Sequence, residues 1–322
     1  MKTEEIPLEL IDLTDQTYIF TFYPRFDQLE QSVRAVGFLY PIILETIVPQ
    51  SKYRIVAGSQ RVKVAQQAGF QQILAQVYAV AERTPLELFE MNLFENLSHR
   101  TLNPIEQAMI IDKLLNQFQL PRTTVIQKFL PVLGTGANPQ LIDRYLALLP
   151  LEMPIKIALA EDILGIDLAQ KLSTLRQPDR SIFFNLCLEL RLGKNRQKEF
   201  LNLFHDLAQL YNCSFQEIGE RINLAALNQD DSGPTPLQAE RVRAALRKLR
   251  LPHLSAVETQ FQSILKKLKL PREIELTPYP YFEEASFTVK FSFQSVADFK
   301  QKLKILTRVS KNPAFEELEH LT

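Results

Sequence analysis

Apolar residues in the first hundred positions form short runs, separated by two longer amphipathic segments. The runs are IPLELIDL, TYIFTF, PIILETIV, YRIVA and ILAQVYAV, and their length is typical of strands. The segment FDQLEQSVRAVG instead places Leu29, Val33 and Val36 on one helical face and stops at Gly37, and SQRVKVAQQAG also has helical spacing. Strands that alternate with helices predict a small α/β domain, which we place at residues 1–98.

Helical patterns dominate from residue 84 to about residue 270. Three capping boxes mark helix starts, TPLE at 84–87, NPIE at 103–106 and SFQE at 214–217. Between them, two short helical patterns at 122–133 and 139–149 flank the turn LGTGAN, and the second has an apolar stripe of Leu141, Tyr145 and Leu148. We therefore predict a helical domain over residues 99–228.

The last third of the chain combines helices with a hairpin. QDDSGPTP at 229–236 predicts a linker, and helices are expected at 237–250, 255–268 and 296–309. EIELTPYPYF and ASFTVKFSF predict a β-hairpin, whose second strand carries on one face Phe287, Val289, Phe291 and Phe293. Residues 237–322 are thus a small α+β domain, and the whole chain is of the α+β class. The phenylalanine face packs either on the helices at 237–268 or on a second copy in a homodimer.

Composition excludes several classes of protein. No run of 18 apolar residues occurs, so a membrane span is not expected, and the start MKTEEIPLEL has no apolar signal core. The two cysteines, Cys187 and Cys213, form no CxxC pair, and the four histidines form no HExxH pair. These counts argue against zinc sites and disulfides and fit a reducing cytoplasm.

Charge is unevenly spread along a chain whose formal net charge is zero. Residues 236–272 carry nine Lys or Arg against two Glu, and residues 171–198 carry seven against two acidic residues. Such basic stretches suit a polyanionic partner, although a solvated helix face explains them equally simply.

The segment YRIVAGSQRVKVAQQAG predicts a strand that turns at Gly58 directly into a helix. A helix N-terminus offers free N–H groups and the positive end of the helix dipole, so it can hold a phosphate, and Arg61 in the first turn can add a charged contact. The simpler alternative is a tight turn at Gly58, a helix capped by Ser59 and a solvated Arg61.

The segment FENLSHRTLNPIEQA carries a second group of polar residues. Glu95 beside Asn96 can coordinate a hydrated Mg²⁺ on a nucleotide, and Arg100 lies in the link to the next helix. Asn103 and Glu106 need no further explanation than their capping box.

Together these two segments resemble the ParB family of chromosome and plasmid partition proteins. The second segment matches the family motif residue for residue at Glu95, Asn96, Leu102, Asn103, Pro104, Glu106 and Ala108, and Arg100 fits the family's arginine with one extra residue before it. PRFDQLEQSVRAVGFLYPIIL also resembles the family's opening segment. The resemblance covers roughly residues 4–175.

The resemblance implies a ParB- and sulfiredoxin-like fold and a CTP–Mg²⁺ site in the N-terminal domain. The expected cofactor-binding residues are Gly58, Ser59, Gln60, Arg61, Glu95, Asn96 and Arg100, with Glu95 and Asn96 toward the metal. The family's first motif reads Gly-Glu-Arg-Arg, whereas this chain has Ser59 and Gln60 in the middle. The loss of one arginine from a polyphosphate site predicts weaker CTP binding and slow or absent turnover. Sulfiredoxin chemistry is excluded, because no cysteine lies near Ser59.

The resemblance also implies a helix-turn-helix over residues 120–150. The 122–133 helix comes first and the 139–149 helix is the recognition helix, joined by a turn longer than the usual three or four residues. Arg122, Lys128 and Arg144 are expected to contact DNA phosphates, and Gln140 to reach a base edge. A plain helical hairpin is the alternative.

We therefore expect a cytoplasmic, nucleoid-associated, ParB-like protein that binds double-stranded DNA. Its role would be chromosome or plasmid partition, or nucleoid or transcription regulation, with a partition ATPase as a partner and binding favoured over catalysis. Two alternatives stay open. One is a CTP-hydrolysing DNA clamp or another phosphotransfer enzyme that uses the same pocket, and the other is a scaffold protein that has lost DNA binding.

Overall fold

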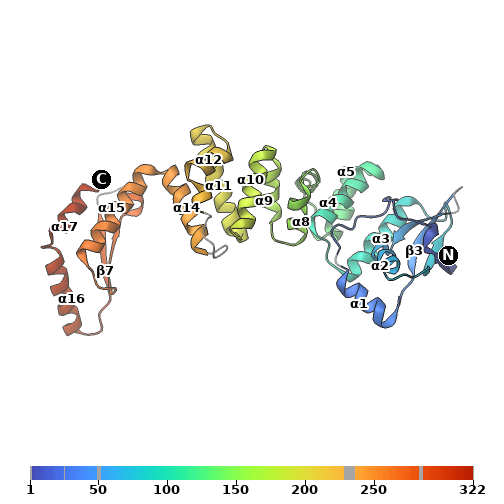
Figure 1. The fold of residues 1–322 in the computed structure, drawn as a ribbon, viewed down its shortest axis with the longest axis horizontal. Coiled ribbons are helices and arrows are strands. Elements are labelled where there is room, and N and C mark those ends of the chain that lie inside the picture. The colour runs from blue at the N-terminus through green and yellow to red at the C-terminus, as the bar shows by residue number, and fades with distance from the viewer. Residues whose placement is uncertain (1, 25, 49–51, 228–235, 283–285, 322) are drawn as a thin grey trace. The chain divides into compact units, whose positions relative to one another are not determined.

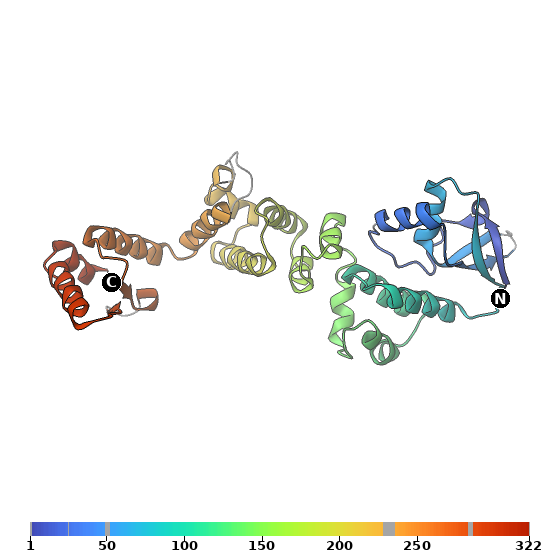
Figure 2. The ribbon, with the colours of Figure 1, turned by 90° about the horizontal axis from the view of Figure 1, so that it is seen from below.

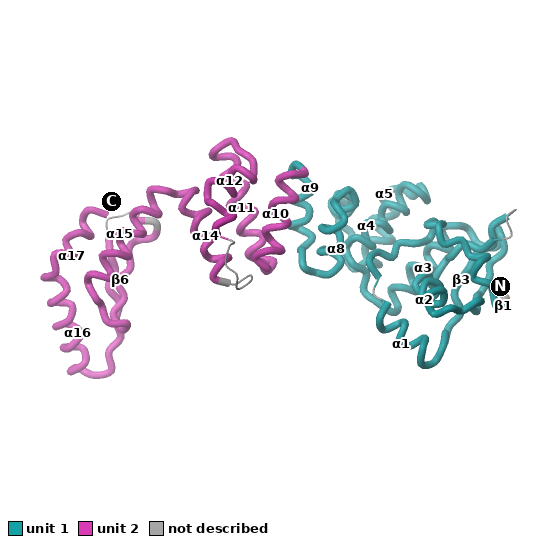
Figure 3. The backbone as a smooth tube through the Cα atoms, viewed as in Figure 1, with its two compact units in different colours: residues 1–176 teal, residues 177–322 magenta. Residues whose placement is uncertain are grey.

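The computed structural model describes residues 2–24, 26–48, 52–227, 236–282 and 286–321. It divides into two compact units, Met1–Arg176 and Gln177–Thr322 (Figure 3). Each unit is described by itself. The finer domain boundaries at 98, 228 and 237 remain predictions. No described helix has both the length and the apolar character needed to cross a membrane.

The first unit begins with a mixed five-stranded sheet (Figure 1). Its strands are β1 (Lys2–Pro7), β2 (Ile11–Asp12), β3 (Ile42–Ile47), β4 (Lys52–Ala57) and β5 (Gln72–Tyr78), in the order β1-β5-β3-β4-β2. The β1–β5 and β3–β4 pairs are antiparallel, and the β3–β5 and β2–β4 pairs are parallel. Helix α2 (Ser59–Gln67) contacts β3 and β5, and helix α1 (Asp27–Val36) contacts α2 (Figure 2). The predicted α/β character of this region is confirmed.

Two strand predictions in this domain are wrong. IPLELIDL is not one strand, because Pro7 starts the 3-10 turn η1 (Leu8–Leu10) that separates β1 from β2. TYIFTF forms no strand, although Tyr18 and Phe20 are fully buried. Side chains rather than a neighbouring strand satisfy the backbone of this segment: Asn92 Nδ2 donates to Tyr18 O at 2.8 Å. The apolar pattern correctly predicted that this segment is buried. It did not predict that side chains would form the hydrogen bonds to its backbone.

The rest of the first unit is helical. Its elements are α3 (Pro85–His99), α4 (Pro104–Asp112), the π-helical turn η2 (Lys113–Gln117), α5 (Arg122–Thr124), the π-helical turn η3 (Val125–Phe129), α6 (Leu130–Val132), α7 (Gln140–Leu146), α8 (Met153–Ala160) and α9 (Ile166–Ser173). The capping boxes predicted at the starts of α3 and α4 are both formed. In the widened turn η3, Leu130 N donates to Val125 O. Pro131 follows directly, and a proline inside a helix cannot accommodate the regular turn before it.

The second unit is helical with a hairpin near its end. Its elements are α10 (Gln177–Glu189), α11 (Lys194–Tyr211), α12 (Phe215–Arg221), α13 (Leu224–Leu227), α14 (Pro236–Arg250), α15 (Pro252–Leu268), β6 (Ile274–Pro278), the 3-10 turn η4 (Pro280–Phe282), β7 (Phe287–Phe291), α16 (Val296–Val309), α17 (Pro313–Glu316) and the 3-10 turn η5 (Glu317–His320). The predicted linker lies outside the described residues, except for Pro236 at the start of α14. Helix α14 packs on α11 and contacts α15.

The predicted hairpin is formed by antiparallel β6 and β7. Phe287 stacks on Phe261 of α15, with ring centroids 6.0 Å apart, so the prediction that this face packs on the chain's own helices is confirmed for Phe287. The ring centroids of Phe293 and Phe299 of α16 are 5.0 Å apart. Phe293 is nevertheless 56% exposed, and Val289 is 42% exposed. The homodimer through this face remains a prediction.

Candidate functional site

A cavity of about 700 Å³ opens in the first unit between α1, the start of α2 and the end of α3. All seven residues predicted to bind a nucleotide line it: Gly58, Ser59, Gln60, Arg61, Glu95, Asn96 and Arg100. The loop after α1 contributes Gly37 and Tyr40, and α3 adds Asn92 and His99. The structure thus brings both predicted motifs to one cavity. Their role in binding a nucleotide remains a prediction.

Gly58 lets β4 turn directly into α2. Its φ of 95° lies in the left-handed region that side chains rarely adopt, and a Cβ atom at this position would lie 2.7 Å from Ile42 Cγ2. Gly58 is also the N-cap residue, and no side chain caps the helix. The expected alternative in which Ser59 caps α2 is therefore wrong. The first N–H groups of α2 keep no intrahelical acceptor, which leaves the helix terminus open to an anion.

Arg61 joins three parts of the cavity wall. Its Nη2 donates to Glu95 Oε1 at 2.7 Å, and its Nη1 donates to Tyr40 O at 3.1 Å and to Pro41 O at 2.9 Å. Burial lowers the pKa of Arg61, and the charge of Glu95 acts in the opposite direction. Arg61 is therefore held in the cavity wall. The simpler alternative, in which Arg61 is solvated, is wrong.

Arg100 is the least satisfied polar group of the cavity. Its Nε donates to Asn96 Oδ1 at 2.9 Å, and its Nη1 donates to Glu106 Oε2 at 2.6 Å. Its Nη2 is buried and has no hydrogen-bond partner among the described residues. A buried donor left without an acceptor costs about 1–3 kcal/mol, so an anionic ligand that reaches this nitrogen gains that much stabilisation.

The protein offers few ligands for a metal ion at this cavity. Glu95 Oε1 is bonded to Arg61, and Asn96 Nδ2 lies 3.4 Å from Glu95 Oε2. Within the described ranges, no three or more His, Cys, Asp or Glu side chains gather in a way that could hold a metal. Glu95 and Asn96 therefore remain only predicted ligands of a Mg²⁺ ion that would be held mainly through nucleotide phosphates and water.

The sequence reasoning missed the role of two residues that support the site. Asn92, only 4% exposed, holds the 17–22 segment through Tyr18 and also accepts a bond from Asn96 Nδ2 at 2.8 Å. Glu106, 1% exposed, caps α4 as predicted, but it also binds Arg100 and accepts from Phe22 N at 3.1 Å. Their positions in the sequence could have indicated these contacts. Asn92 lies one helical turn before Asn96, and Glu106 lies six residues after Arg100.

The predicted DNA-contacting cations are all engaged in ion pairs. Arg122 Nη2 donates to both carboxylate oxygens of Asp143 at 2.8 Å, and Lys128 Nζ lies 2.6 Å from Glu90 Oε1. Arg144 pairs with Asp167. Gln140 is exposed at the start of α7. These pairs are at least partly solvated and contribute at most about 1 kcal/mol each, and the DNA contacts of the three cations remain a prediction.

The turn between the two short helices is long and is anchored to α4. It spans residues 133–139, with Gly134 and Gly136 both at φ 75°. Gln107 Nε2 of α4 donates to Leu133 O at 3.1 Å, and α7 packs against α4. Helix α7 ends at Leu146, three residues before the predicted end of the recognition helix. The helix-turn-helix over residues 120–150 stays a prediction.

Residues 2–97 match the family model of the ParB N-terminal domain. This segment is a ParB-like N-terminal domain. A probable chromosome-partitioning protein ParB of Neisseria meningitidis is 32% identical over 148 residues, which cover 46% of this chain and 48% of that protein. The ParB of Myxococcus xanthus is 31% identical over 169 residues, 52% of this chain and 53% of the relative. The chain therefore spans about half the length of the curated relatives it matches.

Two solved structures of ParB from Caulobacter crescentus, both C-terminally truncated, are also similar to this ParB-like chain. The complex with CTP-γ-S is 23% identical, with a TM-score of 0.27, and covers 55% of this chain and 95% of its own. The complex with the centromeric parS site is 21% identical, with a TM-score of 0.36, and the match covers 61% of this chain and 97% of the solved chain.

Proposed function

We propose that this chain is a ParB-like DNA-binding protein of chromosome or plasmid partition whose N-terminal cavity binds CTP. One observation carries the proposal: two ParB-like motifs, 34 residues apart at Arg61 and Glu95, line one cavity that holds a buried arginine nitrogen without a partner. The match of residues 2–97 to the ParB N-terminal domain supports the same reading.

The cavity offers two donor groups to a triphosphate. They are the open N-terminus of α2 after Gly58 and the buried Nη2 of Arg100, and Arg61, whose terminal nitrogens are bonded within the wall, adds its positive charge beside them. Glu95 and Asn96 would hold Mg²⁺ on the phosphates. Gln60 gives no charge where the family has an arginine, so affinity is reduced and hydrolysis slow or absent.

Substitution of Arg100 tests the cavity. Calorimetry with CTP and Mg²⁺ on the full chain should show binding at least about ten-fold weaker for Arg100→Gln, because a charge-assisted bond contributes about 1.5–3 kcal/mol. Arg100→Lys should retain part of the affinity. Arg83→Gln is the matched control, since Arg83 precedes α3 outside the cavity and its side chain is 52% exposed. Equal affinities in Arg100→Gln and Arg83→Gln, with both variants folded, would contradict the proposal.

Contact with duplex DNA is proposed to run through residues 120–150, with Arg122, Lys128 and Arg144 on phosphates and Gln140 at a base edge. The slope of log affinity against log salt should fall by about one in Arg144→Gln. The exposed Arg34 of α1 provides the control variant Arg34→Gln, which should leave the slope unchanged. Partition ATPase binding and homodimer formation belong to the same proposal.

The scaffold alternative is favoured by one observation, the carboxylate partner on each of the three proposed phosphate contacts. It predicts no binding to any duplex pool at about 50 mM salt, where phosphate contacts are strongest.

A further inference from the structure

The second unit holds a basic groove far along the sequence from the cavity described above. Helices α11 and α14 pack together and carry eight Lys or Arg against three Asp or Glu, a net charge of +5 in a chain whose net charge is zero. A cavity of about 390 Å³ lies between them, lined by Glu199, Asn202, Leu203, Arg243, Arg247, Arg250 and Leu251. We refer to these seven residues as the arginine groove.

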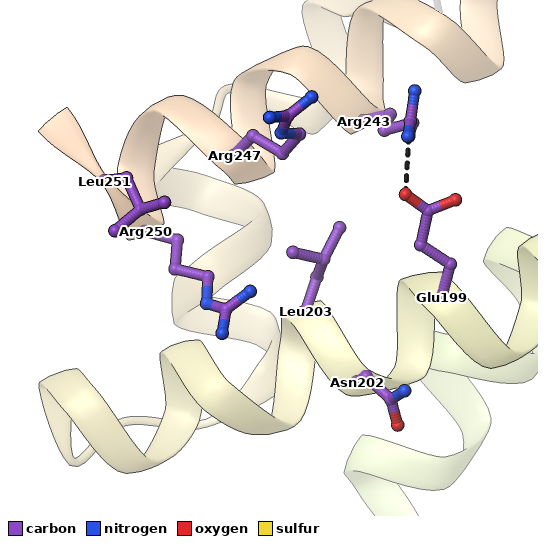
Figure 4. A pocket seen from close by; sticks show the side chains of 7 residues that line it. All are labelled: Glu199, Asn202, Leu203, Arg243, Arg247, Arg250 and Leu251. Atoms are coloured by element: carbon purple, nitrogen blue, oxygen red, sulfur yellow. Dashed lines mark hydrogen bonds and ion pairs between the residues drawn. The ribbon is translucent and has the colours of Figure 1, made fainter. Parts of the chain in front are cut away.

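Three arginines of α14 form one row along the arginine groove. Arg243, Arg247 and Arg250 are four and three residues apart, a spacing that puts them on one face of the helix over a rise of about 10 Å. Figure 4 shows their guanidinium groups at separate places along the groove, not converging on one point. A row of this kind suits a linear polyanion better than a single small anion.

The carboxylates of α11 hold the ends of the row but leave its middle open. Arg243 Nε lies 2.6 Å from Glu199 Oε1, and Arg250 Nη2 lies 2.8 Å from Asp206 Oδ2 (Figure 4 shows the first pair). Hydrogen bonds and charge from Glu199 raise the pKa of Arg243. Arg247 is exposed and has no side-chain partner among the described residues. Two arginines are thus fixed in orientation, while the third keeps all its donors for a partner.

We propose that the arginine groove binds the phosphate backbone of double-stranded DNA without reading its sequence. Phosphate is the natural partner of guanidinium, which donates two parallel hydrogen bonds to it. Arginine can also bind the edge of a guanine, but carboxylates of α11 hold two of these three arginines, which favours contacts to the backbone over base readout. This surface is additional to the contact proposed for residues 120–150 and does not depend on it.

Neutralising Arg247 tests this inference on the full chain. Anisotropy titrations with a fluorescent duplex of random sequence, between about 50 and 200 mM salt, should show the salt slope reduced by about one for Arg247→Gln, and affinity about five- to ten-fold lower near 100 mM salt. Arg247→Lys should keep most of the slope. Because Arg247 has no side-chain partner to lose within the described ranges, unfolding of the variant is not expected, and circular dichroism checks this.

Lys248→Gln is the matched control. Lys248 is the next residue of α14, is also exposed, and does not line the arginine groove. An unchanged slope in Arg247→Gln, or the same loss in both variants, would overturn the inference. So would displacement of the duplex by low-millimolar inorganic phosphate beyond its ionic-strength effect, since that result would mark a site for a single small anion.

Discussion

Arg61 and Glu95 form an ion pair of 2.7 Å between the start of α2 and the end of α3. Their side chains are only 18% and 31% exposed, and Arg61 also holds the carbonyls of Tyr40 and Pro41. Through this pair, the two ParB-like motifs become walls of the same cavity. The pair is also a structural feature that can be tested without any ligand.

Glu95→Gln should lower the free energy of unfolding by about 1–2 kcal/mol. This value lies between an exposed pair, at up to about 1 kcal/mol, and a fully buried one, at about 3–5 kcal/mol. Urea denaturation measures it. Glu30→Gln provides the comparison, because Glu30 pairs with Arg34 at 3.7 Å on the surface and should cost less than about 0.5 kcal/mol. Equal effects of the two substitutions would show that the cavity pair is not a constraint on the fold.

Gly58→Ala should destabilise the first unit more than Gly69→Ala does. Both glycines have positive φ, 95° and 79°, so both substitutions introduce backbone strain of about 1–2 kcal/mol. Only at Gly58 would the added Cβ also meet Ile42 Cγ2, at 2.7 Å, whereas nothing lies within 4 Å at Gly69. Thermal denaturation of both variants compares them directly. A larger loss for Gly69→Ala would show that the close approach to Ile42 is easily relieved.

Gln60→Arg should strengthen CTP binding by about ten-fold or more. The substitution adds a charge-assisted donor at the open end of α2, inside the cavity wall. Gln67→Arg adds the same charge to an exposed position at the other end of the helix and should change little. Calorimetry with CTP and Mg²⁺ measures both variants, and equal gains would mean that overall charge rather than the cavity sets the affinity.

Stability should fall in acid partly through Asp15. Burial alone would raise the pKa of Asp15, but hydrogen bonds from Thr17 and Arg54 outweigh it and the pKa is lowered. A carboxyl group whose pKa is lowered by folding stabilises the protein above its unfolded pKa of about 3.9 and loses this effect as pH falls through the folded value. Asp15→Asn should therefore be less stable at pH 7 by about 1 kcal/mol, with the difference shrinking below about pH 4. Urea denaturation from pH 2.5 to 7 tests this, and a constant difference over that range would contradict it.

Local signals in the sequence predicted much of the candidate site. A turn was expected at Gly58 because the predicted helix follows the predicted strand without a linker. The capping boxes correctly predicted where α3 and α4 start. The 17–22 segment was misjudged because the groups that satisfy its backbone, on Asn92 and Glu106, lie more than 70 residues away. A periodic pattern reports burial but not the identity of a distant partner.

The same limit applies to the proposed DNA contacts. Arg122 and Arg144 were expected to contact DNA phosphates, yet each pairs with a carboxylate 21 or 23 residues further along the chain. Whether a cation is available depends on such neighbours. The phosphate contact proposed for Arg247, which has no side-chain partner among the described residues, would displace no carboxylate.

Hydrogen–deuterium exchange of the full chain, with and without CTP and Mg²⁺, tests the central claim most directly. If the two motifs form one nucleotide site, peptides that cover Gly58–Arg61 and Glu95–Arg100 should become protected together, while peptides from α11 remain unchanged. Absence of protection at about 5 mM CTP, or protection of one motif without the other, would contradict it.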